Sequence, residues 1–388
     1  MLEAEERPPR PAKFDRSLRP PAPAQKAAEI DAMHQTVVRQ MLHYLARPHD
    51  GLPRGTLEGP AAWRGDTLEE PRWREELSDA DRDELEAAIV ASEQSCPSLQ
   101  NLDAAHFPLP FFGARIARWR EALTAGPGLR LIGGFPVERW GPERSARCFW
   151  GLGQHLGLPG AQDPQGTLLG HVRDRGLPDD SGRAYRTNQE IHFHCDGADV
   201  VGLMCLAPSA RGGLSRVVSS ITVFNALYAT APSLAARLFE PFWLDSRGDS
   251  WVQGAPVRPC RHFRGTLRTF YHTDYFRSAS RHPGIPDLSA KDRATLDAYD
   301  EIANSPGIYL DMPLRAGDVQ LIHNHTLLHA RTAYSDASED RRRHLLRLWL
   351  SLDRPVDLHE RMAIARSYMG TLGGLVRQGL RERLKLPA

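Results

Sequence analysis

The chain has 388 residues, of which 25% are charged and 41% are hydrophobic, and it carries 49 basic against 48 acidic residues. This is the composition of an ordinary globular protein, and it excludes a mainly disordered chain. The net charge of +1 gives no electrostatic reason to expect binding to nucleic acid or to an anionic membrane. All but four of the basic residues are arginines, and there are 16 histidines.

The chain has five cysteines and no C-x-x-C pair. An odd, sparse set in a long chain is typical of reduced thiols in a cytosolic protein. The first residues carry charges instead of an apolar signal core, and no run approaches the roughly 18 apolar residues of a membrane span. We therefore expect a cytoplasmic protein without a transmembrane segment.

The N-terminal third has helical patterns behind a proline-rich start. Residues 1–24 hold six prolines among mixed charges, which predicts an extended, flexible arm. Apolar residues at helical spacing predict a helix over 24–47, which Pro48 ends. A second helix is expected to begin at Ser78, which can cap it, and a third to cover 112–125. Residues 25–128 thus form an expected helical N-terminal extension.

After about residue 160, short apolar runs broken by Gly, Pro and Asp replace the helical periods, and several alternate as strands do. The runs cover residues 191–196, 200–206, 214–218, 266–271, 307–312, 318–323 and 344–352. One interruption, 289–303, has a helical pattern. Because no long Gly/Ser linker intervenes, we expect one unit with helices packed on a β-rich barrel or double sheet.

An H-x-D sequence stands in the first of these runs. His194 and Asp196 point to the same face of an extended segment, so both can reach one metal ion. A distant second histidine would complete a 2-His-1-carboxylate triad, which leaves coordination positions open on Fe(II). A second H-x-D, His272 and Asp274, competes for this role. Each could equally be a strand histidine hydrogen-bonded to an acid.

The candidate second histidine lies in the segment 315–331. Gly317 and Asp318 predict a turn, after which a strand follows. If the extended pattern continues, three histidines share a face, and spacing alone does not choose among His323, His325 and His329.

Two arginines stand on the final predicted strand. Arg343 and Arg347 share a face with Leu345 and Trp349, while four leucines line the other face. Arginine is rarely buried without a partner, and its fork matches a carboxylate. The two arginines therefore bind either a carboxylate ligand or carboxylates of the protein itself.

Together these segments resemble the TauD/TfdA branch of the Fe(II)/2-oxoglutarate-dependent dioxygenases. The resemblance extends from Gln162 to about Leu352, and is faint before Leu129. Its four motifs occur in the family order: H-x-D at 194–196, Gly-Gly-x-Ser at 212–215, N-x4-H-x-R at 324–331, and arginines at 343 and 347.

The resemblance implies a fold and a set of roles. The fold would be α+β, with a double-stranded β-helix (jelly-roll) core over 129–388 and surrounding helices. His194, Asp196 and His329 would bind Fe(II). Arg343, assisted by Ser215, would hold the distal carboxylate of 2-oxoglutarate, and O2 would be the second co-substrate. Arg347 matches a position that grips an acidic substrate group in some members.

The implied reaction is oxidation, most simply hydroxylation, of an unactivated C–H bond, with release of succinate and CO2. The carboxylate of Asp196 favours oxygenation over halogenation, which needs a vacant position for chloride. Desaturation or cyclisation would use the same chemistry. A non-oxidative metalloenzyme or a non-catalytic binding protein on the same fold are the competing interpretations.

The substrate is expected to be a small molecule of specialised metabolism, and Arg347 favours one that bears a carboxylate. Aromatic and polar residues expected to ring the site are Tyr185, Asn188, Glu190, Tyr271, His272 and Trp349. Core packing is the competing interpretation for Tyr271 and Trp349. The sequence leaves open a homo-oligomer and a substrate tethered to a carrier protein.

Overall fold

The computed structural model describes residues 47–352 without 164, 175, 177–186, 248–252 and 339–341, and also residues 362–363, 366–367, 369–370, 373–374 and 377. The proline-rich arm, Tyr185 and all but the last residue of the helix predicted over 24–47 lie outside the described residues. Within the described part of the chain, no helix combines the length and apolar character that a bilayer span requires. All five cysteines are buried and unpaired.

The larger of two main sheets has seven strands in the order β1-β2-β14-β6-β17-β3, with β4 also pairing with β17. β1 and β2 pair in parallel, and the other neighbours are antiparallel. The strands are β1 (Arg74–Glu76), β2 (Leu129–Gly133), β3 (Leu158–Pro159), β4 (Leu169–Val172), β6 (Val200–Ala207), β14 (Val319–His323) and β17 (His344–Ser351). Residues before Leu129 thus contribute an edge strand to this sheet.

The smaller sheet has four antiparallel strands in the order β13-β8-β15-β5. They are β5 (Ile191–His194), β8 (Ser215–Ser219), β13 (Leu310–Met312) and β15 (Leu327–Arg331). One apolar cluster joins the two sheets, because it contains Ile322 and Leu345 of the larger sheet with Val217 and Leu327 of the smaller. The sheets therefore pack against each other through this cluster, which we call the inner core.

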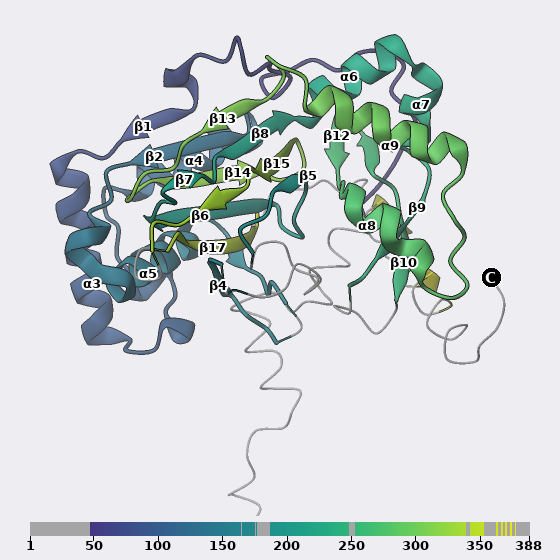
Figure 1. Cartoon of the computed structure of the whole chain (residues 1–388). Helices are drawn as coiled ribbons and strands as arrows, with labels where there is room; N and C mark the ends of the chain where they lie inside the picture. The colour runs from purple at the N-terminus through teal and green to yellow at the C-terminus, as the bar shows by residue number, and fades with distance from the viewer. Residues whose placement is uncertain are drawn as a thin grey trace, which may run out of the picture.

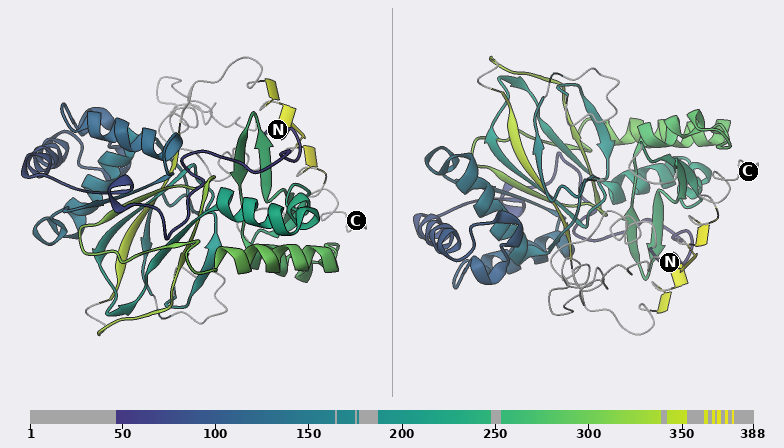
Figure 2. Two further views of the ribbon diagram at one scale, coloured as in Figure 1. Left: turned by 90° about the horizontal axis from the view of Figure 1, so that it is seen from above. Right: turned by 90° about the horizontal axis from the view of Figure 1, so that it is seen from below.

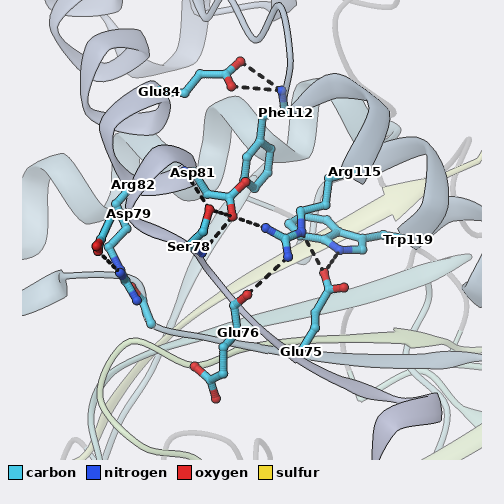
Figure 3. Close-up of polar contacts among 11 residues, drawn as sticks. Glu75, Glu76, Ser78, Asp79, Asp81, Arg82, Glu84, Phe112, Arg115 and Trp119 are labelled. Carbon is cyan, nitrogen blue, oxygen red and sulfur yellow. Dashed lines mark hydrogen bonds and ion pairs between the residues drawn. The ribbon is translucent and has the colours of Figure 1, made fainter.

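Helices α3 (Asp79–Ser95), α4 (Gly113–Thr124) and α5 (Val137–Leu156) cover the outer face of the larger sheet (Figure 1). Leu346, Leu348 and Leu350 of β17 pack there with Trp150 of α5. Ser78 caps α3 as predicted, in a capping box with Asp81. Figure 3 shows how polar contacts bind this layer together: Arg115 pairs with Asp81, and the Trp119 indole donates to Glu75.

A second helical group covers the outer face of the smaller sheet. It consists of α6 (Ser220–Thr230), α7 (Pro232–Arg237), α8 (Thr273–Ser278) and α9 (Ala290–Ala303). Val218 and Leu328 of the sheet pack with Phe224 and Leu296 of these helices. The two helical groups lie on opposite sides of the sheets in both views of Figure 2.

Smaller elements complete the fold. Three two-stranded sheets pair β9 (Phe242–Asp245) with β10 (Gly254–Val257), β11 (Cys260–Phe263) with β12 (Thr266–Thr269), and β7 (Arg211–Gly212) with β16 (Tyr334–Ser335). Short 3-10 helices cover Glu70–Arg72, Leu99–Asn101, Ala104–His106 and Ala279–Arg281. The architecture is a mixed α+β fold in which helices enclose two packed sheets.

Candidate metal centre and its surroundings

Two strands of the smaller sheet bring the H-x-D sequence and a distant histidine together. His194 ends β5 and lies directly opposite His329 of β15 in the antiparallel ladder. We call the apolar cluster between the smaller sheet and helices α6 to α9 the outer core; it includes Val218, Phe224, Leu296 and Leu328. The neighbours of His194, Phe193 and Cys195, belong to this outer core, so the His194 side chain points the other way, toward the inner core. The ring centroids of His194 and His329 are 4.2 Å apart.

The Asp196 carboxylate faces both rings. Its Oδ1 is 3.7 Å from Nε2 of His194, and its Oδ2 is 3.7 Å from Nε2 of His329. One ligand atom from each of the three residues lies within 4.8 Å of the others. The side chains are only 11–12% exposed. Two imidazoles and one carboxylate in this arrangement form the donor set typical of non-haem Fe(II).

Backbone contacts fix two of these ligands. Nδ1 of His194 lies 2.9 Å from the carbonyl oxygen of His192, which directs Nε2 toward Asp196. The Asn324 amide accepts from the Asp196 N–H at 3.0 Å and donates to the carbonyl oxygens of Asp196 and Ala198. Asn324, in the turn between β14 and β15, thereby ties the Asp196 loop to the strand that carries His329.

The protonation states also suit a metal ion. Burial, with the nearby His329 and His272 rings, holds the pKa of His194 well below its usual range. Burial opposes ionisation of Asp196, but the Arg347 charge and the His329 and His194 rings hold the pKa of that carboxyl far below its usual range. A neutral imidazole and an ionised carboxylate are the forms that bind metal.

Strand β17 of the larger sheet faces this centre from the opposite side. The indole N–H of Trp349 donates to Asp196 Oδ2 at 2.9 Å, and Arg347 Nη1 lies 3.3 Å from the same oxygen. Gln162 clamps Arg347, because its amide accepts from Arg347 Nε at 2.7 Å and donates to the Arg347 carbonyl at 2.9 Å. The predicted faces of β17 agree with this arrangement.

Arg343, the residue directly before β17, is 3% exposed. Its Nη1 has no hydrogen-bond partner among the described residues, and burial lowers the pKa of its guanidinium. Ser215 is also buried and donates to Gln320 Oε1 at 3.0 Å. A buried cation with an unused donor is a ready site for an anion such as a carboxylate.

The other candidate histidines lie elsewhere. A turn after His323 separates β14 from β15, so the extended pattern does not run through to His329 as the shared face would require. Nδ1 of His323 lies 2.9 Å from Thr326 Oγ1, and Nε2 of His325 lies 2.7 Å from the buried Asp199 carboxylate. Neither belongs to the cluster of possible ligands.

His272 lies beside the centre without joining it. It forms a β-bridge with His194, and the two ring centroids are 5.0 Å apart. Its ring stacks on Tyr275 at 3.6 Å, and its Nδ1 has no partner among the described residues. Asp274, the acid of the second H-x-D, turns instead to His192, 3.3 Å from its Nδ1.

Of the two interpretations of Tyr271, the structure supports core packing. Its side chain is fully buried in the outer core beside Tyr299, and its hydroxyl donates to Asp300 at 2.7 Å. It follows directly before His272, so alternation turns it to the opposite face. Asn188 is partly buried and its carbonyl accepts from the Tyr334 N–H, whereas Glu190 is exposed.

Sequence reasoning missed several contributors. The clamp by Gln162 had no local signal, since 185 residues separate it from Arg347. In the sequence Arg331 is only the last residue of the N-x4-H-x-R motif, yet it is 6% exposed and donates to the carbonyl oxygens of Thr187 and Gln189. Burial and the nearby Arg343 charge lower the pKa of Arg331 to about 10.

Comparisons with known proteins agree with this chemistry. A family model described as "Taurine catabolism dioxygenase TauD, TfdA family" matches residues 94–349. The chain is 31% identical over 315 residues to FR-33289 synthase of Streptomyces rubellomurinus, which covers 76% of this chain and 90% of that protein. It is 28% identical over 289 residues to the taurine hydroxylase-like protein SAT17 of Stachybotrys chartarum, covering 70% and 73%.

Similar folds occur among solved structures. Asparagine oxygenase in complex with Fe(II), 3-hydroxyasparagine and succinate superposes with a TM-score of 0.59 at 15% identity, over 72% of this chain and 93% of that one. The non-haem iron oxygenase OrfP with Fe and α-ketoglutaric acid gives 0.53 at 17% identity, over 72% and 94%. The TM-scores show a shared fold, and at these low identities the likeness extends no further than the fold.

Proposed function

The chain belongs to the TauD/TfdA family of Fe(II)- and 2-oxoglutarate-dependent oxygenases, and on that premise we propose that it hydroxylates an unactivated C–H bond of a small metabolite bearing a carboxylate. The observation that carries this proposal is the closeness of Arg347 to the ligand set: its guanidinium lies 3.3 Å from the Asp196 carboxylate. An anionic group held by Arg347 would therefore place the rest of a small molecule next to the metal.

The residues divide the work in the following way. His194, Asp196 and His329 would hold Fe(II), and Arg343 with Ser215 would hold the distal carboxylate of 2-oxoglutarate. When bound, iron and 2-oxoglutarate supply the activation of O2, and the co-substrate leaves as succinate and CO2. Gln162 keeps the Arg347 side chain extended toward Asp196, so that this cation can orient a substrate. The packed sheets limit access of water to the centre.

The names of similar proteins support a small, polar substrate. The solved structures include an asparagine oxygenase and OrfP with (3S)-hydroxy-L-Arg, both with hydroxylated amino acids bound. Amino acids carry a carboxylate, and the charge of Arg347 would attract this group. His272 and Trp349 lie beside the ligand set and are proposed as further substrate contacts, and Asn188 and Glu190, on the segment before β5, as more distant ones.

We also propose the finer architecture. The face-to-face sheets, with β14 in one and β15 in the other and antiparallel apart from the β1–β2 pair, fit a double-stranded β-helix in a domain that begins at residue 129, and helices α3 and α4 fit a helical extension before it.

The test is anaerobic reconstitution with Fe(II) and 2-oxoglutarate, followed by a screen of small acids for perturbation of the metal-to-ligand charge-transfer band. Each acid is paired with its amide as a matched control. We expect acids, and not their amides, to perturb the band in the wild type, and the difference to disappear in Arg347→Gln. An active acid should then gain one oxygen atom by mass. Perturbation by neutral amides alone would contradict a carboxylate-bearing substrate.

A further inference from the structure

Two buried arginines share one aromatic ring near the inner core. The guanidinium carbons of Arg331 and Arg343 lie 4.9 Å and 5.1 Å from the centroid of the Tyr334 ring. All three residues are at most 6% exposed. We call Arg331, Tyr334 and Arg343 the two-arginine cluster.

Strand register places Arg331 on the same side as the metal ligand His329. The two residues are two positions apart on β15, so their side chains leave the same face. The intervening Ala330 belongs to the outer core. Arg331 also lies directly opposite Ser215 in the β15–β8 ladder, so the Ser215 hydroxyl shares this face.

The spacing suits a five-carbon dicarboxylate. Two positions along a strand cover about 6.6 Å. This is on the order of the length of extended 2-oxoglutarate, whose keto acid end would be held at the metal. Its other end would therefore reach the level of Arg331 and Ser215.

Among the described residues, the two-arginine cluster lacks carboxylates to balance its positive charge and acceptors for several of its hydrogen-bond donors. Among the residues that the structure describes, neither guanidinium forms an ion pair, and Asp336 accepts only from the Arg343 main-chain N–H at 2.9 Å. Nη2 of Arg331 is used by Thr187 and Gln189. The unsatisfied buried polar atoms are Nε and Nη1 of Arg331, Nη1 of Arg343 and the hydroxyl of Tyr334.

Buried donors without acceptors, on two like charges, are costly unless an anion completes the site. We propose that Arg331 is a second binding residue for 2-oxoglutarate, which donates from Nε and Nη1 to the carboxylate far from the metal, together with Arg343 and the Tyr334 hydroxyl. This inference rests on the proposed position of 2-oxoglutarate between His329 and Arg343. It gives the arginine of the H-x-R sequence a ligand in addition to its backbone contacts.

The competing account is purely structural: Arg331 would only anchor the segment 187–189. Comparing the binding of 2-oxoglutarate and 2-oxopentanoate distinguishes the binding role of Arg331 from the purely structural one. In 2-oxopentanoate a methyl group replaces the distal carboxylate of 2-oxoglutarate, and the metal-binding end is unchanged. We would titrate both acids anaerobically into the full-length Fe(II) protein and follow the charge-transfer band.

We expect Arg331→Gln to weaken 2-oxoglutarate binding about 10- to 100-fold, as loss of hydrogen bonds to a charged group does. Binding of 2-oxopentanoate should stay within about twofold of the wild type. The matched control is Arg216→Gln on the adjacent strand, because Arg216 points to the other face and pairs with the exposed Asp311. It should change neither affinity.

Equal loss of affinity for both acids in Arg331→Gln would overturn the proposal in favour of the anchor, and so would unchanged affinity for both. If Arg331→Gln does not fold, Tyr334→Phe decides, since it removes only the unsatisfied hydroxyl. We expect this variant to weaken binding of 2-oxoglutarate by about fivefold and to leave binding of 2-oxopentanoate unchanged. If Tyr334→Phe does not selectively weaken binding of 2-oxoglutarate, the proposal is overturned. A wild type without any Fe(II)/2-oxoglutarate band would contradict the co-substrate site itself. A band that is lost in Arg343→Gln but kept with wild-type affinity in Arg331→Gln and Tyr334→Phe would contradict only the role of Arg331 and Tyr334.

Discussion

The indole N–H of Trp349 donates a 2.9 Å hydrogen bond to Oδ2 of Asp196, across the space between the larger and smaller sheets. This contact sets the rotation of the only carboxylate in the described ligand cluster. Partners of this kind orient ligands, and their loss costs about 10- to 100-fold in metal affinity.

Trp349→Phe should therefore lower the affinity for Fe(II) by about tenfold, measured by anaerobic competition with a chelating dye. The matched control is Trp150→Phe, which removes an indole that donates to the Leu102 carbonyl in the core behind the larger sheet. That variant should lose stability while it keeps its affinity for iron. Equal iron affinity in both variants would refute the orienting role of Trp349.

Asn324 links the Asp196 loop to β15 by three hydrogen bonds of its side-chain amide. Asn324→Ala leaves buried backbone groups without partners, so we expect a loss of about 2–3 kcal/mol in the free energy of unfolding together with weaker iron binding. Asn225→Ala is the control, because the Asn225 amide bridges the N–H and the carbonyl of Leu57 in a similar way. Asn225→Ala should be less stable than the wild type but should bind iron with the same affinity. Iron binding that is unchanged in Asn324→Ala would show that the loop keeps its shape without the amide.

Gly213 has a φ of +68°, and a Cβ there would lie 2.5 Å from Ser209 Oγ and 3.2 Å from Arg343 Nε. Gly213→Ala should cost about 1–2 kcal/mol of stability from backbone strain and also displace Arg343, which would raise the Kd for 2-oxoglutarate. Gly265→Ala has the same kind of strain at φ +78° but open space around the new methyl group. A binding titration of both variants should show weaker binding only for Gly213→Ala. Equal Kd values would mean that Arg343 tolerates the methyl group.

Asp245 anchors the segment next to His272 and Tyr275. It accepts from Arg247 N–H and the Ser278 hydroxyl at 2.9 Å and 2.8 Å, and it pairs with Arg281 and His282 at 2.9 Å. Burial opposes its ionisation, but the hydrogen bonds from His282, Arg247 and Ser278 and the Arg281 charge hold the pKa of this carboxyl below its ordinary value. Its charge therefore stabilises the folded protein at neutral pH.

Asp245→Asn should lower the free energy of unfolding by about 3 kcal/mol at pH 7, measured by urea denaturation. Because the folded-state pKa is lower than the unfolded one of about 3.9, the stabilisation is complete above about pH 5 and is lost as the pH falls through the folded pKa. The difference between wild type and variant should thus shrink below about pH 4. The control Asp311→Asn breaks a surface pair and should cost less than about 1 kcal/mol. A difference that stays constant down to pH 3 would contradict a carboxylate that is ionised at neutral pH.

Local patterns in the sequence predicted much of the fold. Alternation identified β5, β6, β14 and β17, and Ser78 marked the start of α3 because its capping box is a short-range feature. Four described α-helices were not predicted: α5, α6, and the six-residue helices α7 and α8. Helix α5 contains Gly141 and Pro142 inside its span. Helix α6 is apolar on several sides, because its buried positions include adjacent residues such as Val223 and Phe224. The helical spacing of apolar residues identifies a straight helix with one buried face, so it fails for a kinked helix and for a helix that is buried on several sides.

The candidate site was only partly predictable, because several of its contacts join residues that are far apart in the sequence. Motif order pointed to His194, Asp196 and His329, and the structure brings these residues together. Spacing could not separate His329 from His325, since the choice depends on the turn at Asn324 between two sheets. Arg347 contacts Gln162 and Asp196, and Arg331 donates to the Thr187 carbonyl; each of these partners is more than 140 residues away. Their identity follows from sheet packing that no local pattern encodes.

The most direct test of the central claim is anaerobic titration of Fe(II) and 2-oxoglutarate into the wild type and into His194→Ala, Asp196→Ala, His329→Ala and the control His323→Ala. We expect the charge-transfer band and substrate-dependent succinate release for the wild type and the control, and neither for the three ligand variants. A ligand variant with the wild-type band and full turnover would contradict the assignment of His194, Asp196 and His329 as the iron centre.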